Sequence, residues 1–286
     1  MSKIYFAGTE DINYALMAKL GGAKHCLMTA FPFVKRGAIT RAFIADYLAS
    51  FCKGVILDSG LFTLMFGAEK GNKSEHFIYE WQDKLIEFIK NNDERLIPVE
   101  VDCQKVLSPQ HAWSLRKRMR ESLRGRTFIN VYHFEDKKKG LDEMIEFSDY
   151  IAISVPEIRG KKGVDTDDVV YKLACYIKNQ KPRIGIHLLG CTQLSILEKC
   201  RFVSSSDSTS WKQFARWGAH SVVQSGRIVK ARVMYDHDET ERLVLQELKT
   251  LGKAEPTQKM KSLLCDGVVQ VREHIKIYSK HAGAQN

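Results

Sequence analysis

The sequence predicts an α/β fold whose simplest form is a (β/α)₈ TIM barrel, and three observations support it. Short apolar runs rich in β-branched residues recur through the first 207 residues. Amphipathic helical patterns separate most of these runs, and polar residues end them. Strands that alternate with helices form parallel β–α units, and about eight units in roughly 200 residues is the count of a closed barrel. A doubly wound open sheet is the alternative, which one or two miscounted strands would favour.

The period of the apolar residues predicts the elements one by one. Runs with the length and composition of strands lie at residues 4–8, 25–29, 54–60, 96–102, 127–133, 150–155, 183–190 and 201–207. Apolar residues at three-to-four spacing predict helices at residues 45–53, 76–92, 112–124, 141–147 and 167–180.

The character of the chain changes after residue 207. Residues 204–220 are polar and carry tryptophan, which predicts a loop rather than a further strand. Two helical patterns follow, at residues 238–252 and at about 257–280. We therefore expect a barrel domain over residues 1–217 and a C-terminal helical extension, packed on the barrel, over residues 218–286.

The composition is that of a soluble globular protein, with 44% hydrophobic and 27% charged residues. No apolar run approaches the roughly 20 residues of a membrane-spanning helix. The N-terminal segment MSKIYFAGTED lacks the pattern of a signal peptide. The sequence therefore predicts a cytoplasmic protein without a membrane partner.

The seven cysteines are scattered and include no Cys-x-x-Cys pair. In a reducing compartment this usage predicts buried free thiols. Convergence of His237, Cys265 and His274 on zinc is the alternative, with little support because zinc requires strict ligand geometry. No metal and no cofactor is predicted.

Positive charge is in excess, with a net charge of +10, and this favours a polyanionic partner such as nucleic acid. Basic residues gather in three clusters that follow neighbouring predicted strands. A solvated helix face is the simpler interpretation of any single cluster, but three together indicate a continuous basic surface. The predicted nucleic-acid contacts are Arg116, Lys117, Arg120, Arg124, Lys161 and Lys162, joined by Trp211.

Polar residues end most of the predicted strands. In a barrel, the carboxyl ends of all strands meet at one face, where the loops build the active site. Asp and Ser also end strands as helix N-caps, which is the alternative for one or two positions. The strand-end residues are Thr29, Asp58, Asp102, His133, Ser154, His187 and Asp207.

Two short motifs place acids at strand ends beside groups that could contact a ligand. LDSGLF (57–62) combines Asp58, Ser59 and Gly60 with Phe62, which could stack on a flat ring. VEVDCQ (99–104) supplies Asp102, whose carboxylate could accept N–H groups of a base. A common turn and a loop cap are the alternative interpretations.

The most polar segment is FVSSSDSTSW (202–211). Asp207 lies among hydroxyl groups that could orient it, and Trp211 could pack beside a sugar or a base. Such a run is more often a flexible Ser-rich loop, but here it closes the last predicted strand.

Together, the order and spacing of these motifs resemble the tRNA-guanine transglycosylases, over roughly residues 3–217. LDSGLF resembles their Asp-Ser-Gly-Gly-Phe/Tyr signature, and VEVDCQ resembles their second Asp-bearing strand. Residues 181–211 resemble the late segment that ends at their nucleophilic Asp. FAGTE, the LDSG strand and DSTSW are most similar to compact bacteriophage members, which are implied to place 7-deazaguanine bases in DNA.

The resemblance implies a role for each matching residue. Asp207 matches the nucleophile that attacks C1′ and displaces guanine, and Asp58 matches the general acid/base. Paired carboxyl groups suit covalent retention at a glycosidic carbon. The implied partners are nucleic acid and a free 7-deazaguanine base. The expected substrate-binding residues are Ser59, Gly60, Phe62, Asp102, Tyr132, His133, Ser154 and His187, of which Asp102 would read the base and Phe62 would stack on it.

The sequence departs from the family pattern in ways that bear on the substrate. Leu61 replaces the second Gly of the signature, and Tyr132-His133 replaces the base-reading Gln. Ile153-Ser154-Val155 replaces a Gly-Gly-Leu segment, so the resemblance does not fix the identity of the inserted base. The family's zinc subdomain, which lies beside tRNA, has no counterpart here. This difference favours DNA over tRNA as the substrate.

Two other functions are compatible with the predicted barrel. An aldolase or isomerase acting on a phosphorylated metabolite would use the same acids, but LLGCTQLS only weakly fits the phosphate loop it needs. A catalytically inactive nucleic-acid-binding barrel is the third possibility, against which the intact Asp58 and Asp207 argue.

Overall fold

Eight parallel strands form a single sheet in the computed structural model, which describes residues 2–37, 42–61, 74–216, 220–224, 227–231 and 238–283. The strand order is β4-β3-β2-β1-β8-β7-β6-β5, and an isolated parallel bridge between Val99 and Ile129 joins the two edges. Each strand therefore neighbours the next along the chain, and the sheet closes into a barrel. The predicted (β/α)₈ fold is confirmed, rather than the doubly wound sheet.

Each of the predicted strands is present, because short β-branched runs suit a strand that is covered on both faces. The helices outside and the side chains inside the barrel leave most strand residues buried. The strands are β1 (Lys3–Ala7), β2 (His25–Thr29), β3 (Gly54–Asp58), β4 (Leu96–Pro98), β5 (Asn130–Tyr132), β6 (Tyr150–Ser154), β7 (Gly185–Leu189) and β8 (Ser205–Ser208).

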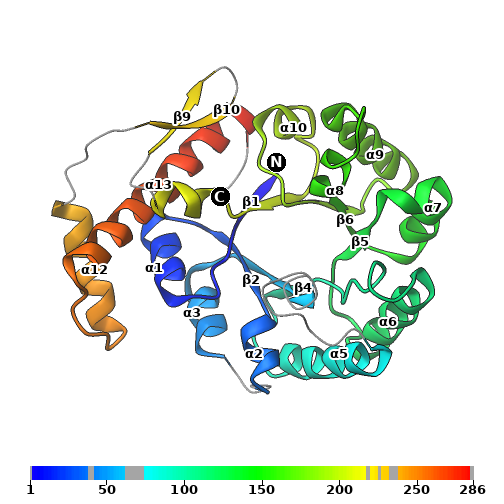
Figure 1. Cartoon of the computed structure of the whole chain (residues 1–286), viewed down its shortest axis with the longest axis horizontal. Coiled ribbons are helices and arrows are strands. Elements are labelled where there is room, and N and C mark those ends of the chain that lie inside the picture. The colour runs from blue at the N-terminus through cyan, green and yellow to red at the C-terminus, as the bar shows by residue number, and fades with distance from the viewer. Residues whose placement is uncertain are drawn as a thin grey trace.

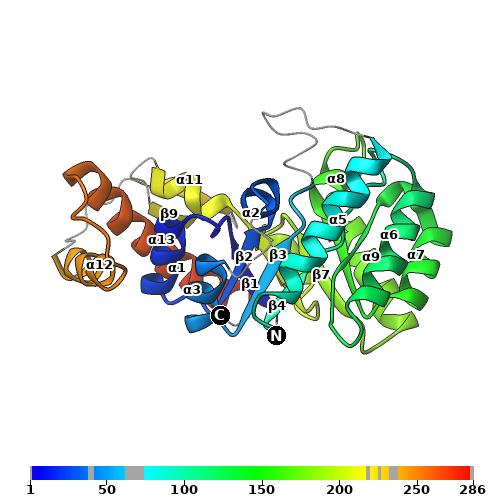
Figure 2. The same ribbon diagram turned by 90° about the horizontal axis from the view of Figure 1, so that it is seen from below.

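Helices surround the strands (Figures 1 and 2). The main ones are α1 (Ile12–Gly21), α3 (Phe43–Phe51), α5 (Glu75–Lys90), α6 (Pro109–Ser122), α7 (Lys137–Phe147), α9 (Thr166–Gln180), α10 (Leu194–Lys199) and α13 (Gln258–Ala282). Shorter elements follow several strands and lie near the carboxyl ends of the sheet: α2 (Phe31–Lys35), η1 (Phe134–Asp136), α8 (Val155–Arg159) and α11 (Ser210–Arg216).

Helix α13 completes the ring of helices by packing against both α1 and α10. The contact with α1 is close, since a side chain at Gly267 would collide with Met17 and one at Gly21 would collide with Val271. Before α13 come an antiparallel hairpin of β9 (His220–Gln224) and β10 (Arg227–Ala231), and then α12 (Asp238–Thr250). The part of the chain after residue 217 thus supplies the eighth helix of the barrel.

Two local predictions need correction. Residues 210–216, expected as loop, form α11, whose Trp211 ring packs edge-on against Phe6 and Tyr14. Helix α1 was not predicted, because residues 15–18 are all buried and so show no amphipathic period.

Two further expectations concern membranes and cysteines. Within the described ranges, no helix is both long enough and apolar enough to cross a membrane. All seven cysteines are free thiols and all but Cys175 are buried, as predicted.

Apolar side chains form separate layers inside and outside the strands. The interior of the barrel holds Tyr5, Leu27, Ile56, Ile129 and Ala152, among others. Larger clusters lie between the strands and the helices. Because side chains alternate between the two faces of a strand, every second residue of each strand faces the interior. The last of these interior-facing residues lies at the carboxyl end of its strand.

A buried ion pair joins the β4 side of the barrel to β5. The Arg116 guanidinium donates from Nε and Nη2 to the Glu100 carboxylate, at 2.8–3.0 Å, and both side chains are 2% exposed. The same carboxylate accepts from the Asn130 side chain and, at 3.0 Å, from the Val131 N–H. Arg116 is therefore a structural residue, which corrects its predicted role as a nucleic-acid contact.

We predict that Arg116→Ala lowers the free energy of unfolding by about 3–5 kcal/mol, because it leaves the Glu100 charge buried without its partner. The matched control is Lys117→Ala on the same helix, where the side chain is exposed and the change should stay within about 0.5 kcal/mol. Equilibrium urea unfolding measures both. Equal effects of the two substitutions would contradict a stabilising role for the ion pair.

Candidate active site

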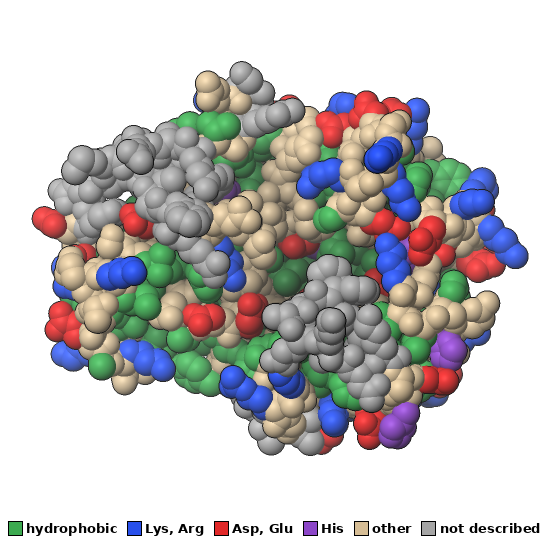
Figure 3. Space-filling model, in the orientation of Figure 1, with side chains coloured by type: hydrophobic (Ala, Val, Ile, Leu, Met, Phe, Trp, Pro, Cys, Tyr) green, Lys and Arg blue, Asp and Glu red, His purple; other side chains and the backbone are tan. Residues whose placement is uncertain are grey.

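A cavity of about 870 Å³ opens at the carboxyl ends of the strands. Residues in or directly after each of the eight strands line it, from Ala7 on β1 to Asp207 and Ser208 on β8. Figure 3 shows this face, with acidic side chains near its centre and basic side chains scattered around it. The cavity lies where a barrel places its active site.

Asp207 projects from β8 into the cavity and is held by two N–H donors. Oδ1 accepts from Nε2 of His187 at 3.0 Å and from the backbone N–H of Gly190 at 2.8 Å. The residue is only 7% exposed. Two N–H donors on one oxygen suit an ionised carboxylate of fixed orientation.

Asp58 lines the same cavity from the end of β3. Burial raises the pKa of its carboxyl to about 6, and the negative charges of Asp207 and Asp102 add to that rise. A hydrogen bond from the Gly60 N–H to Oδ1, 2.8 Å long, opposes it. Asp58 can therefore hold or release a proton close to neutral pH.

The two carboxyl groups have complementary environments. Asp207 is stabilised as an acceptor by N–H groups, whereas the pKa of Asp58 is raised by burial beside other acids. Two carboxyl groups in one cavity, one held by N–H donors and the other able to donate a proton, form the arrangement that glycosidic chemistry uses.

Asp102 and His133 belong to a chain of charged side chains at the part of the cavity wall that follows β4 and β5. His133 contacts Oδ1 of Asp102 through Nε2 at 2.7 Å and Oε2 of Glu157 through Nδ1 at 3.0 Å. Burial opposes a charge on the ring, but these two carboxylates outweigh it and raise the pKa of His133 to about 9. Lys105 extends the chain, with Nζ 3.3 Å from Glu157 Oε1. His133 is therefore a cation at neutral pH, and it fixes Asp102.

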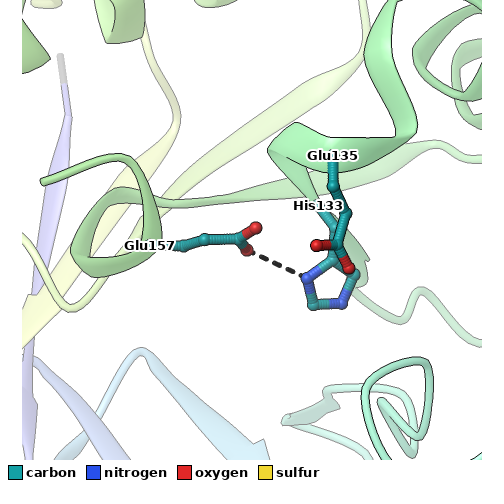
Figure 4. A group of neighbouring side chains, drawn as sticks. All are labelled: His133, Glu135 and Glu157. Atoms are coloured by element: carbon teal, nitrogen blue, oxygen red, sulfur yellow. Dashed lines mark hydrogen bonds and ion pairs between the residues drawn. The ribbon is translucent and has the colours of Figure 1, made fainter. Parts of the chain in front are cut away.

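The residues that come closest to a metal-binding set are His133, Glu135 and Glu157 (Figure 4). One ligand atom from each lies within 4.8 Å of the others. Metal binding needs a neutral imidazole nitrogen, yet Nδ1 of His133 already pairs with Glu157. These contacts favour an ion-paired histidine over a metal ligand.

The Asp-Ser-Gly motif forms the end of β3 and the turn that follows it. Gly60 has a φ of +76°, and a Cβ there would lie 2.7 Å from the Phe31 backbone nitrogen. Its role is thus to turn the chain and to donate to Asp58, and the cavity is lined instead by Ser59 and Leu61. Phe62 lies outside the described residues.

Two predicted substrate contacts lie away from the cavity. Tyr132 is 2% exposed, packs between strands and helices, and donates to the Lys137 carbonyl at 3.2 Å. His187 is 0% exposed and touches Asp207 from below instead of meeting a ligand. Alternation along β5 turns Tyr132 towards the helices, and His187 lies below the cavity in the barrel interior, so both predictions are corrected. Asp102, His133 and Ser154 do line the cavity.

The predicted basic surface divides between opposite ends of the barrel. Arg120 and Arg124 border a second pocket, of about 470 Å³, together with residues at the amino ends of β5 and β6. Lys117 lies in a groove between α6 and α7. Only Lys161 and Lys162, in the loop between β6 and α9, share the end that carries the cavity. Trp211 is 1% exposed, and so it cannot pack against nucleic acid.

Several residues of the site were not predicted. Glu10 and Lys105 line the cavity from loops, Glu157 lines it from α8, and Gly190 supplies the amide that holds Asp207. Glu157 follows a strand by three residues, so the strand-end rule could have been extended to it. Nothing in the sequence signals the pairing of Gly190 with Asp207.

Comparisons with known proteins add little to this site. No family model matches the chain, and no curated protein matches it. A solved structure described as "QR15, an Aldolase" is 15% identical, with a TM-score of 0.46, covering 73% of this chain and 90% of that chain.

We predict that Asp58→Asn stabilises the protein relative to the wild type at pH 8 but not at pH 4. The pKa of about 6 lies above the ordinary 3.8, so the folded state binds more protons between these values and loses stability as pH rises through them. Because Asn cannot ionise, the difference should grow by about 1–3 kcal/mol from pH 4 to pH 8. Urea unfolding at both pH values measures it.

The control for this experiment is Asp149→Asn, at a side chain that is 83% exposed. Its stability relative to the wild type should depend only weakly on pH. A similar pH dependence for the two variants would contradict the raised pKa of Asp58.

Proposed function

We propose that this protein is a base-exchange transglycosylase that replaces guanine in nucleic acid, with DNA favoured, by a 7-deazaguanine base. The observation that carries the proposal is the pair of carboxyl groups in one cavity. Asp207 is held as an acceptor and Asp58 has a pKa of about 6. The resemblance of the motifs around both residues to guanine transglycosylases supports the same assignment.

The chemistry proceeds in two displacements. Asp207 attacks C1′ of the target nucleoside, the C1′–N9 bond breaks, and Asp58 in its acid form gives the departing guanine its proton. The incoming deazaguanine then loses its N9 proton to Asp58. Its N9 forms the new bond to C1′ and releases Asp207 as a carboxylate. Two inversions retain the configuration at C1′, and no net proton is consumed.

Base recognition falls to the wall that follows β4 and β5, which adjoins Asp58 on β3. Asp102 lines the cavity, and its side chain stays 28% exposed although His133 holds Oδ1. A carboxylate so fixed can accept the N–H groups of a guanine Watson–Crick edge. Leu61 and Val106 provide apolar surface on which a flat base can lie.

The alternative of an aldolase or isomerase for a phosphorylated substrate needs free amides in the loop after β7. The Gly190 N–H, at the start of that loop, donates to Asp207 instead. Helix α10, which follows the loop, is only six residues long. The occupied Gly190 amide and the short helix favour base exchange over an aldolase or isomerase reaction.

We predict that the purified protein exchanges radiolabelled guanine, or a labelled 7-deazaguanine, into DNA and that Asp207→Asn abolishes the exchange. Asp58→Asn should lower the rate by about 100-fold or more, because the leaving base then lacks its acid. Incorporation is counted on duplex DNA, single-stranded DNA and tRNA in parallel. Exchange into tRNA alone would overturn the DNA preference, and no exchange into any of them would overturn the enzyme assignment.

We further predict that the cavity-bearing end of the barrel binds the nucleic acid. Replacing Lys161 and Lys162 by Gln should weaken DNA binding and lower the salt dependence by about one unit of log–log slope for each phosphate that the variant no longer neutralises. The matched control replaces Arg120 and Arg124 by Gln, which removes the same charge from the opposite end. Fluorescence anisotropy at several salt concentrations compares them. A larger loss of affinity in the arginine variant would place the DNA elsewhere.

A further inference from the structure

A chain of buried polar side chains lies beneath Asp207, inside the barrel. Nε2 of His187 contacts Asp207, and its Nδ1 lies 2.6 Å from Oγ of Ser205. The Tyr150 hydroxyl lies 2.5 Å from the same Ser205 oxygen. His187 and Ser205 are both 0% exposed. Burying polar groups in an apolar interior costs free energy unless they are paired, and here each of these side chains is paired with the next. The question is therefore what this hydrogen-bonded series does for Asp207.

The strand register brings these residues together. His187 and Ser205 face each other across β7 and β8 in the parallel pairing. Ser205 and Asp207 lie two residues apart on β8 and so point to the same face. Tyr150 pairs with Gly185, where a Cβ would lie 2.6 Å from the tyrosine ring, so the glycine leaves room for that ring.

The hydrogen bonds are consistent with one direction of donation. An ionised Asp207 can only accept, so Nε2 of His187 carries a proton. On a neutral ring Nδ1 then accepts from the Ser205 hydroxyl, whose oxygen in turn accepts from Tyr150. Burial raises the pKa of Tyr150 to about 12, against the effect of its bond to Ser205, so the phenol keeps its proton. Each donor has an acceptor.

We propose that Tyr150, Ser205 and His187 are positioning residues that hold Asp207 for attack on C1′, an inference that rests on the proposed function. His187 and Gly190 fix Oδ1, and among the described residues no hydrogen bond reaches Oδ2. Oδ2 is thus the attacking oxygen. It forms the bond to C1′ while the C1′–N9 bond breaks, and Oδ1 keeps both donors as it becomes the ester carbonyl. No proton moves along the chain.

The test removes single hydroxyl groups. Ser205→Ala and Tyr150→Phe should lower kcat, and the single-turnover rate of forming the trapped covalent Asp207–DNA adduct, by roughly tenfold, with KM for the base nearly unchanged. His187→Phe should lower both by roughly 100-fold, as loss of a positioned donor does. His187→Gln, which keeps an N–H donor, should recover part of that loss.

Matched controls remove buried hydroxyl groups elsewhere. Ser206 is next to Ser205 on β8 and 0% exposed, but its hydroxyl makes no hydrogen bond with the described residues, so Ser206→Ala should leave both rates unchanged. Tyr47→Phe removes a phenol that donates to Glu247 at 2.8 Å, outside the cavity. If Ser205→Ala and Tyr150→Phe are as active as these controls, the inference is overturned.

A measurement that needs no activity separates this inference from the proposed function. Nitrogen-15 NMR of labelled histidine, with the His187 signals assigned by their loss in His187→Phe, should show Nε2 protonated and Nδ1 bare. Ser205→Ala should shift the Nδ1 signal. A proton on Nδ1 alone would overturn the inference even in an active enzyme. A wild-type protein that exchanges no base would overturn the proposed function, and the NMR result would then decide whether the chain exists as described.

Discussion

The seam between β4 and β5 is where the barrel has least backbone pairing. Both strands are three residues long, and they meet at the single bridge between Val99 and Ile129. The Glu100 carboxylate crosses this seam to the Val131 amide and the Asn130 side chain, while Arg116 neutralises it from α6. Asp102 and His133 each follow one of the two strands. Their contact, and with it this wall of the cavity, depends on this closure.

The fixed register of the closed barrel also explains why only some residues of each strand reach the cavity. In each strand the interior-facing residues alternate with those that face the helices. On β8 this places Ser205 inside the barrel and Asp207 at its mouth, with Ser206 turned outwards. The same rule turns Tyr132 away from His133. Strand geometry therefore decides which members of a polar motif can meet a ligand.

Much of the fold could be predicted because short β-branched runs and amphipathic helices have distinct periods. Strand ends then identified Asp58, Asp102, His133 and Asp207 as neighbours, which the cavity confirms. Helix α1 was not predicted because it is buried on all sides, so its apolar residues show no amphipathic spacing. The prediction for Trp211 was wrong because the Ser-rich run before it is typical of a loop, whereas a helix begins there. Arg116 belonged to a basic cluster by sequence, and only the three-dimensional position of Glu100 shows that its charge is neutralised inside the protein.

The place of α13 in the ring has a consequence for the order in which the protein can fold. Its residues 258–282 are made after every strand, yet they pack against both α1, at the start of the chain, and α10. During synthesis the emerging polypeptide therefore exposes the apolar sides of α1 and α10 until the last helix arrives. Removal of α13 should therefore leave an incomplete barrel that is prone to aggregation.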